Sequence, residues 1–221
     1  MTEATLQPPC PLCQQATRWC CRDRRRPYYH CAQCGMVHVA AAWHLSAHDE
    51  RAQYDLHDNQ VHDPGYRQFL SRLAKPLLER LPSRAEGLDF GCGPGPALAS
   101  MLDERGHPTA VYDLYYAPDE SVFKRQWDFI TSSEVVEHLA QPQQELQRLW
   151  HCLKPGGWLG IMTKRVTDLT AFNNWHYKND PTHISFFSEQ SFVWLAEQWQ
   201  AELEFIGADV VLLQKPATRQ G

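Results

Sequence analysis

The stretch Leu88-Asp89-Phe90-Gly91-Cys92-Gly93-Pro94-Gly95 is the strongest structural signal in this chain of 221 residues. Its apolar start predicts the end of a buried strand, and its glycines predict a turn that leads into a helix over 96–104. A strand followed by Gly-x-Gly-x-Gly brings bare backbone close to a ligand, because only glycine lets a nucleotide or amino acid lie against the main chain. We therefore expect a ligand of this kind at the turn.

Two aspartates flank this turn and suit different parts of such a ligand. Asp89 precedes the glycines, where it suits a ligand ammonium group. Asp113 ends the next apolar run, 109–112, and suits ribose hydroxyls. Pro94 and Pro96 stand beside the glycines and would obstruct a helix start that cradles a pyrophosphate. The pattern therefore disfavours a nicotinamide-dependent oxidoreductase.

Together these residues resemble the nucleotide-binding motif of class I S-adenosylmethionine-dependent methyltransferases. The resemblance covers 86–215 and includes Lys154-Pro155-Gly156-Gly157 between a helix over 142–153 and a strand over 158–163. It implies S-adenosyl-L-methionine as the cofactor. It is the basis for the cofactor-binding residues we predict, which are Asp89, Gly91, Cys92, Gly93, Gly95, Asp113, Leu114, Ser133 and Glu134.

The order of elements predicts the fold class. Strands and helices alternate after residue 86, which is typical of an α/β protein with a doubly wound, Rossmann-like parallel sheet. Runs at 203–206 and 209–214 flank Gly207-Ala208 and predict a hairpin, as in the antiparallel terminal strand of the methyltransferase sheet. Only 114–126 separate the strand ending at Asp113 from the strand at 127–131. The family normally has a helix and another strand there, so we expect a shortened sheet.

The first 42 residues contain two Cys-x-x-Cys pairs. Cys10 and Cys13 precede Cys31 and Cys34 by a spacing expected of a four-cysteine zinc site. Each pair aims two thiolates at one ion, and two pairs complete a tetrahedron. We therefore predict a zinc ribbon that binds Zn²⁺, with 36–39 as a strand. Cys20 and Cys21 are expected to lie in a loop and to play no part.

Length and composition define the class of protein. The chain can hold one α/β core over 86–215, the ribbon over 1–42, a helical lead-in over 43–85 and a short tail over 216–221. No apolar run approaches the ~20 residues that span a bilayer, and no signal peptide begins the sequence. We expect a cytoplasmic protein with no membrane span, and the sequence carries no signal of its oligomeric state.

The charge of the chain is uneven. Residues 1–40 hold five arginines against Glu3 and Asp23, a balance of +3, whereas the remainder carries −8. A net acidic core argues against a long nucleic-acid footprint. The basic ribbon, with Arg22 and Arg24-Arg25-Arg26, still allows a role in holding phosphate, another anion or RNA, beside the alternative of a structural cap.

The lead-in predicts two helices before the core. Ser46 and Asp49 have the spacing of a helix start that continues to Tyr54, and 66–81 have apolar residues at helical spacing with Pro76 as a kink or break. In methyltransferases of this type such helices often cover the cofactor and substrate. Tyr54, His57 and Tyr66 are therefore candidates for a lid, with solvated loop residues as the alternative.

The predicted acceptor site follows the strand at 127–131. Glu134, Glu137 and His138 have the i, i+3, i+4 spacing that would place them on one face of a helical turn. With His183 before Phe-Phe-Ser, the set resembles that of small-RNA 2′-O-methyltransferases, and ubiquinone-pathway O-methyltransferases share the Glu-x-x-Glu-His part. The resemblance implies that Glu134, Glu137, His138 and His183 hold a divalent ion, Mg²⁺ or Mn²⁺, which binds vicinal hydroxyls.

Two alternatives to the divalent ion stay open. His138 or His183 would serve as a metal-free base or orienting group, or these side chains would be structural. His176 is a second candidate base, and Asp180 would orient an imidazole. Trp175, Tyr177, Phe186 and Phe187 would wall an acceptor pocket or pack in the core.

These observations rank the function hypotheses. The first is an S-adenosylmethionine-dependent methyltransferase (EC 2.1.1.-) that acts on a small molecule at oxygen, with the ribbon as cap or clamp. The second is an RNA methyltransferase that holds RNA through the basic ribbon. The third is a binding protein whose methyltransferase-like core is catalytically silent.

Overall fold

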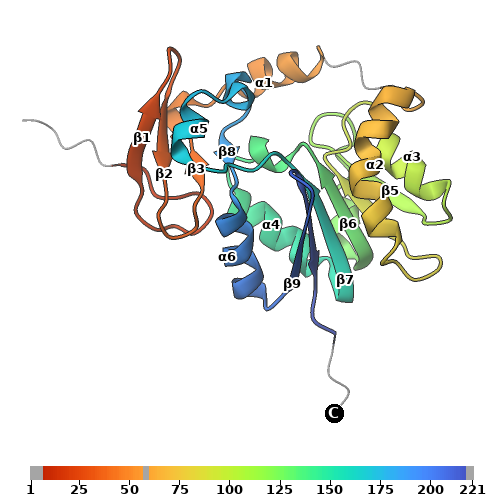
Figure 1. The fold of residues 1–221 in the computed structure, drawn as a ribbon. Helices are drawn as coiled ribbons and strands as arrows, with labels where there is room; N and C mark the ends of the chain where they lie inside the picture. The colour runs from red at the N-terminus through yellow and green to blue at the C-terminus, as the bar shows by residue number, and fades with distance from the viewer. Residues whose placement is uncertain (1–6, 57–59, 218–221) are drawn as a thin grey trace, which may run out of the picture.

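The computed structural model describes residues 7–56 and 60–217, and two sheets organise them (Figure 1). The larger sheet has six strands in the order β5 (Thr109–Tyr112), β4 (Gly87–Phe90), β6 (Trp127–Ser133), β7 (Leu153–Met162), β10 (Val210–Gln214) and β9 (Glu202–Ile206). The first four strands are parallel, and β10 pairs antiparallel with both β7 and β9. The predicted Rossmann-like sheet with an antiparallel terminal strand is confirmed.

Helices cover both faces of the large sheet because its strands alternate apolar side chains between two cores. Leu88, Ile130 and Leu159 point to one face, where they pack with α4 (Pro142–His151) and α6 (Glu189–Trp199). Phe129 and Leu212 point to the other, where they pack with α2 (Pro64–Leu78) and α3 (Ala97–Asp103). The sheet is therefore the middle of three layers.

The connection between β5 and β6 is short, as the sequence predicts. A single 3₁₀ turn, η2 (Glu120–Lys124), follows β5, and the described residues form no further strand there. Strand β5 is therefore an edge strand of the large sheet. The turn predicted at 154–157 lies within β7, where Trp127 pairs with Leu153 and Phe129 pairs with Trp158 across an irregular register.

The ribbon forms the smaller sheet together with a strand from the core. Its order is β1 (Arg18–Arg22), β2 (Pro27–His30), β3 (Val37–His38) and β8 (Ser185–Phe186). The pairing of β3 with β8 is antiparallel and joins the ribbon to the segment after His183. Cys20 and Cys21 lie in β1, so the expectation of a loop there is wrong.

The cysteine pairs of the ribbon also pack on the core. Gly35 lies so close to α6 that an added Cβ would come within 2.4 Å of Ser188 Oγ and 2.9 Å of Gln190 Cβ. The Gln190 side chain donates to the carbonyls of Ala32 and Gln33. Phe187, Phe192 and the four cysteines belong to one apolar core cluster. The ribbon is therefore built onto the core rather than tethered to it.

Two lead-in helices connect the ribbon to the core. Helix α1 (Ala47–Tyr54) begins at Ser46, whose hydroxyl accepts from the amide of Asp49 as predicted. Helix α2 starts at Pro64 and contains Pro76 in its last turn, where it continues to Leu78 as a single helix. In Figure 1, α1 runs across the top of the molecule between the ribbon and the core. The predicted lid residue His57 lies outside the described residues.

No helix within the described residues is long and apolar enough to cross a membrane.

Candidate functional site

The glycine turn after β4 leaves open space beside its backbone. Gly91 has φ +78°, and an added Cβ would come within 2.3 Å of the Val135 side chain. Gly93 has φ +64°, and an added Cβ would meet nothing within 4 Å. Both positions need a backbone conformation that favours glycine. The first glycine is required by packing, whereas the second opens onto a cavity.

Asp113 ties this turn to the segment after β5. Its Oδ2 accepts from the Gly93 amide at 3.0 Å, and its Oδ1 accepts from the amides of Tyr115 and Tyr116 at 2.8 and 3.1 Å. The carboxylate thus stands at the carboxyl end of a sheet strand beside the glycine turn, where open α/β sheets bind their ligands.

A cavity of about 840 Å³ begins at this turn and extends to the segment around His183. Most of the predicted cofactor-binding residues line it, namely Gly91, Cys92, Gly93, Asp113, Leu114, Ser133 and Glu134. Asp89 and Gly95 do not line it. Asp89 is buried beneath the turn and accepts from Thr131 Oγ1 at 2.8 Å, and burial raises its pKa to about 6.

Three of the four predicted divalent-ion ligands come together at the far end of the cavity. Glu137, His138 and His183 each offer one ligand atom, and these atoms all lie within 4.8 Å of one another. Glu134 does not join them. It has φ +53° and precedes the 3₁₀ turn η3 (Val136–His138), so the predicted helical face with all three side chains is wrong.

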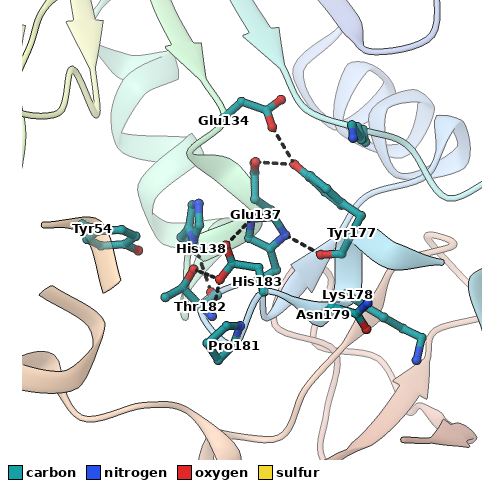
Figure 2. A network of polar contacts seen from close by, with 12 residues as sticks. Tyr54, Glu134, Glu137, His138, Tyr177, Lys178, Asn179, Pro181, Thr182 and His183 are labelled. Atoms are coloured by element: carbon teal, nitrogen blue, oxygen red, sulfur yellow. Dashed lines mark hydrogen bonds and ion pairs between the residues drawn. The ribbon is translucent and has the colours of Figure 1, made fainter. Parts of the chain in front are cut away.

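Each imidazole of this cluster is anchored through Nδ1 to a backbone carbonyl (Figure 2). His183 Nδ1 lies 2.7 Å from Tyr177 O, and His138 Nδ1 lies 3.3 Å from Thr182 O. A carbonyl only accepts, so each Nδ1 carries the proton. Burial lowers the pKa of His183, which leaves its Nε2 with a lone pair. This is the tautomer that a metal ligand needs.

Two buried carboxyl groups meet in the same region. Burial raises the pKa of Glu137 to about 8 and that of Glu134 to about 7. Glu137 is fully buried, and its Oε2 has no hydrogen-bond partner among the described residues; the same is true of Glu134 Oε1. Burying a carboxyl oxygen without a partner is costly. The donor set of Glu137, His138 and His183 therefore fits a divalent cation.

Tyr177 connects these two carboxyl groups, a role that its aromatic character alone did not predict. Its hydroxyl donates to Glu137 Oε1 and lies 3.3 Å from Glu134 Oε2. Figure 2 shows the phenol pointing between the two glutamates. Glu134 lines the cavity while Glu137 lies behind it, so the phenol links the wall of the cavity to the buried cluster.

The remaining candidates differ in position. Asp180 lines the cavity, and its Oδ1 accepts from the Thr182 amide at 2.9 Å. The Oδ2 atom of Asp180 lies 3.8 Å from His183 Nε2. Because that Nε2 carries a lone pair, Asp180 acts instead through Thr182, whose carbonyl accepts from His138 Nδ1. His176 is exposed, lies outside the cavity and contacts Lys164 Nζ at 3.4 Å.

Comparison with known proteins places this architecture in a family. Residues 61–204 match the methyltransferase domain family. The chain belongs to that family. The six-stranded sheet described above is therefore part of a methyltransferase domain.

The relatives of this methyltransferase are distant. A malonyl-[acyl-carrier protein] O-methyltransferase from Enterobacter lignolyticus is 29% identical over 147 residues, which are 57% of this chain and 59% of that protein. The chain thus matches less than two thirds of that relative's length.

Two solved structures share the fold of the methyltransferase. One is a Burkholderia thailandensis 1,6-didemethyltoxoflavin-N1-methyltransferase with bound 1,6-didemethyltoxoflavin and S-adenosylhomocysteine, with TM-score 0.52, 17% identity and coverage of 90% of this chain and 99% of that one. The other is an S-adenosylmethionine-dependent methyltransferase from Archaeoglobus fulgidus, with TM-score 0.51, 16% identity and coverage of 67% and 94%.

The four cysteines of the methyltransferase's ribbon lie together in its interior. Cys10 Sγ is 3.5 Å from Cys34 Sγ, and Cys13 Sγ is 3.4 Å from Cys31 Sγ. All four side chains are buried, and their sulfurs lie within 4.8 Å of one another. Four sulfurs around one Zn²⁺ at about 2.3 Å are roughly 3.8 Å apart. The cluster therefore fits a tetrahedral Zn²⁺ site.

Helix α1 covers one side of the cavity. Glu50 and Tyr54 line it, and the Tyr54 ring stands edge-on to His138 with centroids 5.3 Å apart. Tyr115 donates to Glu50 Oε2 at 2.7 Å, and Tyr116 donates to Asp55 Oδ1 at 2.6 Å. Two phenols that follow Asp113 thus hold α1 and its C-cap.

The four aromatic residues predicted as pocket walls do not line this cavity. Three of them are buried, namely Tyr177, Phe186 and Phe187. Phe186 packs edge-on against Tyr28 of β2 and against Phe172 of the short helix α5 (Leu169–Asn173). Of the two alternatives for the phenylalanines, core packing describes this structure. The phenylalanine and tyrosine side chains that line the cavity are instead Tyr54, Tyr66, Phe69, Phe90, Tyr112, Tyr115 and Tyr116.

Proposed function

We propose that this methyltransferase transfers the methyl group of S-adenosyl-L-methionine to an oxygen of a small molecule bound between the glycine turn and the Glu137–His138–His183 cluster. The observation that carries the proposal is that Gly93, Asp113 and His138 line the same cavity. A cofactor held at the first two residues would direct its methyl group along the same cavity toward the cluster. Methyl transfer is an in-line displacement, so this alignment is what the protein must supply.

The site suggests how the acceptor is held. Glu137, His138 and His183 would bind Mg²⁺ or Mn²⁺, since one carboxylate and two imidazoles with anchored Nδ1 atoms present three ligand atoms within 4.8 Å. A cation at this position would supply the positive charge that lowers the pKa of an acceptor hydroxyl. Asp180 would hold Thr182, whose carbonyl orients His138, and Tyr177 would hold Glu137.

The chain itself supplies the exclusion of water. Tyr54 and Glu50 of α1 close one side of the cavity beside His138. Their contacts with Tyr115 link this cover to the segment that follows β5 and begins at Asp113. Through these contacts, a ligand bound at Gly93 and Asp113 would influence how α1 covers the acceptor end of the cavity. A covered cavity favours a small acceptor over a macromolecule.

Two relatives each support one part of this proposal. The Enterobacter lignolyticus protein is named for transfer to oxygen, on a malonyl group carried by a protein. The Burkholderia thailandensis structure holds a small-molecule substrate, which that enzyme is named for methylating at N1. The RNA alternative rests on the ribbon arginines. Arg26 is buried at 3% exposure, Arg25 donates to Asn179 O and Arg22 lies over the Trp43 ring. Three of the five arginines thus contact other groups of the described chain.

We further propose that Cys10, Cys13, Cys31 and Cys34 bind one Zn²⁺ that stabilises the ribbon. The close approach of four buried sulfurs supports this role, because a segment of this size cannot bury enough apolar surface to fold alone.

Calorimetry with S-adenosylhomocysteine tests the function first. The zinc-loaded protein is titrated with and without about 1 mM Mn²⁺, the level that a weak site requires, and NAD serves as the comparison ligand. Expected results are binding of S-adenosylhomocysteine and not of NAD, and methylation of catechol-like or ribose acceptors that requires Mn²⁺ or Mg²⁺. Glu137→Gln should abolish the increase in methylation that Mn²⁺ or Mg²⁺ causes. Glu197→Gln, on an exposed face of α6, should retain it. Turnover unaffected by metal would instead favour His138 or His183 as a metal-free base.

A further inference from the structure

We propose that Arg26 of the ribbon is a positioning residue for the candidate metal cluster, because it fixes the loop 177–183 that carries His183. This inference rests on the proposed function of that cluster. It also gives the ribbon a specific role, which is to support the acceptor site from a different part of the chain.

The guanidinium of Arg26 binds four backbone carbonyls of this loop. Its Nη1 donates to Pro181 O at 2.7 Å, and its Nη2 lies 2.6 Å from His183 O, 2.9 Å from Asp180 O and 3.3 Å from Lys178 O. The side chain is only 3% exposed. Such a buried cation is normally paired with a carboxylate. Here the four carbonyls converge on it instead.

The ribbon holds Arg26 in place. Its amide donates to Asp23 Oδ1 at 2.9 Å, and its Nε donates to the Tyr28 hydroxyl at 3.2 Å. That hydroxyl in turn donates to Asp23 Oδ2 at 2.6 Å. Arg26 directly precedes β2, which leads to Cys31. The position of the guanidinium is therefore set by the ribbon sheet and by the cysteine pair that follows it.

The remaining carbonyls of the loop contact the cluster and Arg25. Tyr177 O accepts from His183 Nδ1, Thr182 O accepts from His138 Nδ1, and Asn179 O accepts from Arg25 Nη1 at 2.6 Å. Every carbonyl from residue 177 to residue 183 thus has a side-chain partner. Buried backbone groups need such partners. The same short loop is bound by arginines on one side and by both imidazoles on the other.

This arrangement explains why the loop needs an arginine rather than any basic residue. A guanidinium presents five N–H donors in one plane, whereas the lysine ammonium is a compact point with three. Lysine at this position would leave the carbonyl of Pro181 or His183 without a donor among the described residues. An unpartnered buried carbonyl destabilises the conformation that leaves it so, and the loop would shift the His183 ring and the Thr182 carbonyl that anchors His138.

The test compares Arg26→Lys with Arg24→Gln in the full, zinc-loaded chain. Arg24 is exposed in the same segment and, within the described residues, has no hydrogen bond or ion pair to the loop. Zinc content and S-adenosylhomocysteine affinity serve as controls for folding. The two readouts are Mn²⁺ affinity by calorimetry and hydrogen exchange at the amides of Thr182, His183 and Ile184, which donate to Asp180 Oδ1, Asp180 O and Glu137 O.

Arg26→Lys should keep its zinc and its S-adenosylhomocysteine affinity. Its loop amides should exchange on the order of tenfold faster, and its Mn²⁺ affinity should fall by roughly 10–100-fold, as for other residues that orient metal ligands. Arg24→Gln should match the wild type in both. Exchange in Arg26→Lys equal to that in Arg24→Gln would overturn the proposal.

Two further outcomes are distinguishable. If wild-type protein binds no Mn²⁺, the proposed metal function fails, while the exchange measurement still decides whether Arg26 fixes the loop. If Arg26→Lys loses zinc, Tyr28→Phe replaces it, because this variant removes one hydroxyl that contacts Arg26 and Lys178 O and keeps the buried ring. Faster exchange at 182–184 in Tyr28→Phe supports the proposal, and unchanged exchange contradicts it.

Discussion

The hydroxyl of Tyr177 donates to Glu137 and lies 3.3 Å from Glu134 Oε2, so one phenol connects two carboxyl groups whose pKa values are both raised by burial. The hydrogen bond from Tyr177 favours the charged form of Glu137 and opposes the effect of burial. Tyr177 therefore determines how easily Glu137 becomes the carboxylate that a metal ligand must be.

Tyr177→Phe should move metal binding to higher pH. Without the phenol, the pKa of Glu137 rises further above its wild-type value of about 8, and more protons must be displaced when a cation binds. At about pH 7 we expect Mn²⁺ affinity to fall by about tenfold for each pKa unit of the change. Calorimetry between about pH 6 and 9 measures this, with Tyr29→Phe in β2 as the control. Parallel pH profiles for Tyr177→Phe and wild type would contradict the role of the phenol.

The stability of the protein without added Mg²⁺ or Mn²⁺ should fall as pH rises from about 4.5 to about 8. Glu137 has an ordinary pKa of 4.5 and a raised one of about 8 in the folded protein, so in this window the folded state keeps a proton that the unfolded state has lost. The proton on Glu137 contributes its full stabilisation of the folded state below pH 4.5. This contribution is lost as the pH rises through about 8. We expect a decline of about 1 kcal/mol or more, since one pKa unit corresponds to about 1.4 kcal/mol.

Thermal unfolding at several pH values measures this decline. Glu137→Gln cannot titrate, so its unfolding temperature should depend less on pH across the window. A glutamine variant with the full wild-type pH dependence would show that another group is responsible.

The sequence predicted the elements that depend on local signals. The apolar run and glycines at 88–95 predicted β4, the turn and α3, and the short connection at 114–126 predicted a sheet that ends at β5. Cys-x-x-Cys spacing predicted four sulfurs that the structure brings together. In each case the residues that define the feature are neighbours in sequence or have a fixed spacing.

The sequence could not predict features that arise from tertiary contacts. The spacing of Glu134, Glu137 and His138 suggested one helical face, but a positive φ at Glu134, rare for a residue other than glycine, separates it from the other two. In the sequence, Arg26 was a candidate for binding an anion, because it stands in a basic run. Its actual partners are backbone carbonyls about 155 residues away, which form no sequence motif. Likewise, nothing local links Tyr115 to Glu50.

Gly93→Ala should weaken cofactor binding for a steric reason. Gly93 has φ +64°, and an added Cβ would project into the cavity, where it would meet no protein atom within 4 Å. The backbone strain of about 1–2 kcal/mol is matched by Gly106→Ala, which has φ +85° and equally open surroundings outside the cavity lining. Both variants should lose similar stability, and only Gly93→Ala should bind S-adenosylhomocysteine about tenfold or more weakly. Equal affinities in calorimetry would mean that the cofactor does not approach Gly93.

Replacing Cys31 and Cys34 with serine should release zinc and loosen the acceptor site together. The two cysteines follow the strand that begins after Arg26, and Gln190 of α6 donates to the carbonyls of Ala32 and Gln33 between them. Elemental analysis should show one zinc per chain in the wild type and none in the variant. Cys152→Ser, a buried cysteine outside the ribbon, is the control. Retention of zinc by the double variant would rule out the four-cysteine site.

Glu50→Ala should open the cover over the cavity. Helix α1 has no buried residue, so its position depends on polar contacts, and Glu50 accepts from both Tyr54 at 2.8 Å and Tyr115 at 2.7 Å. Losing two hydrogen bonds to a charged group at this point should speed dissociation of S-adenosylhomocysteine by about tenfold. Stopped-flow fluorescence measures the rate, with Arg51→Ala, an exposed residue of the same helix, as the control. Identical dissociation rates in the two variants would show that α1 does not restrict the ligand, and the acceptor would then reach the Glu137–His138–His183 cluster from solvent without a moving cover.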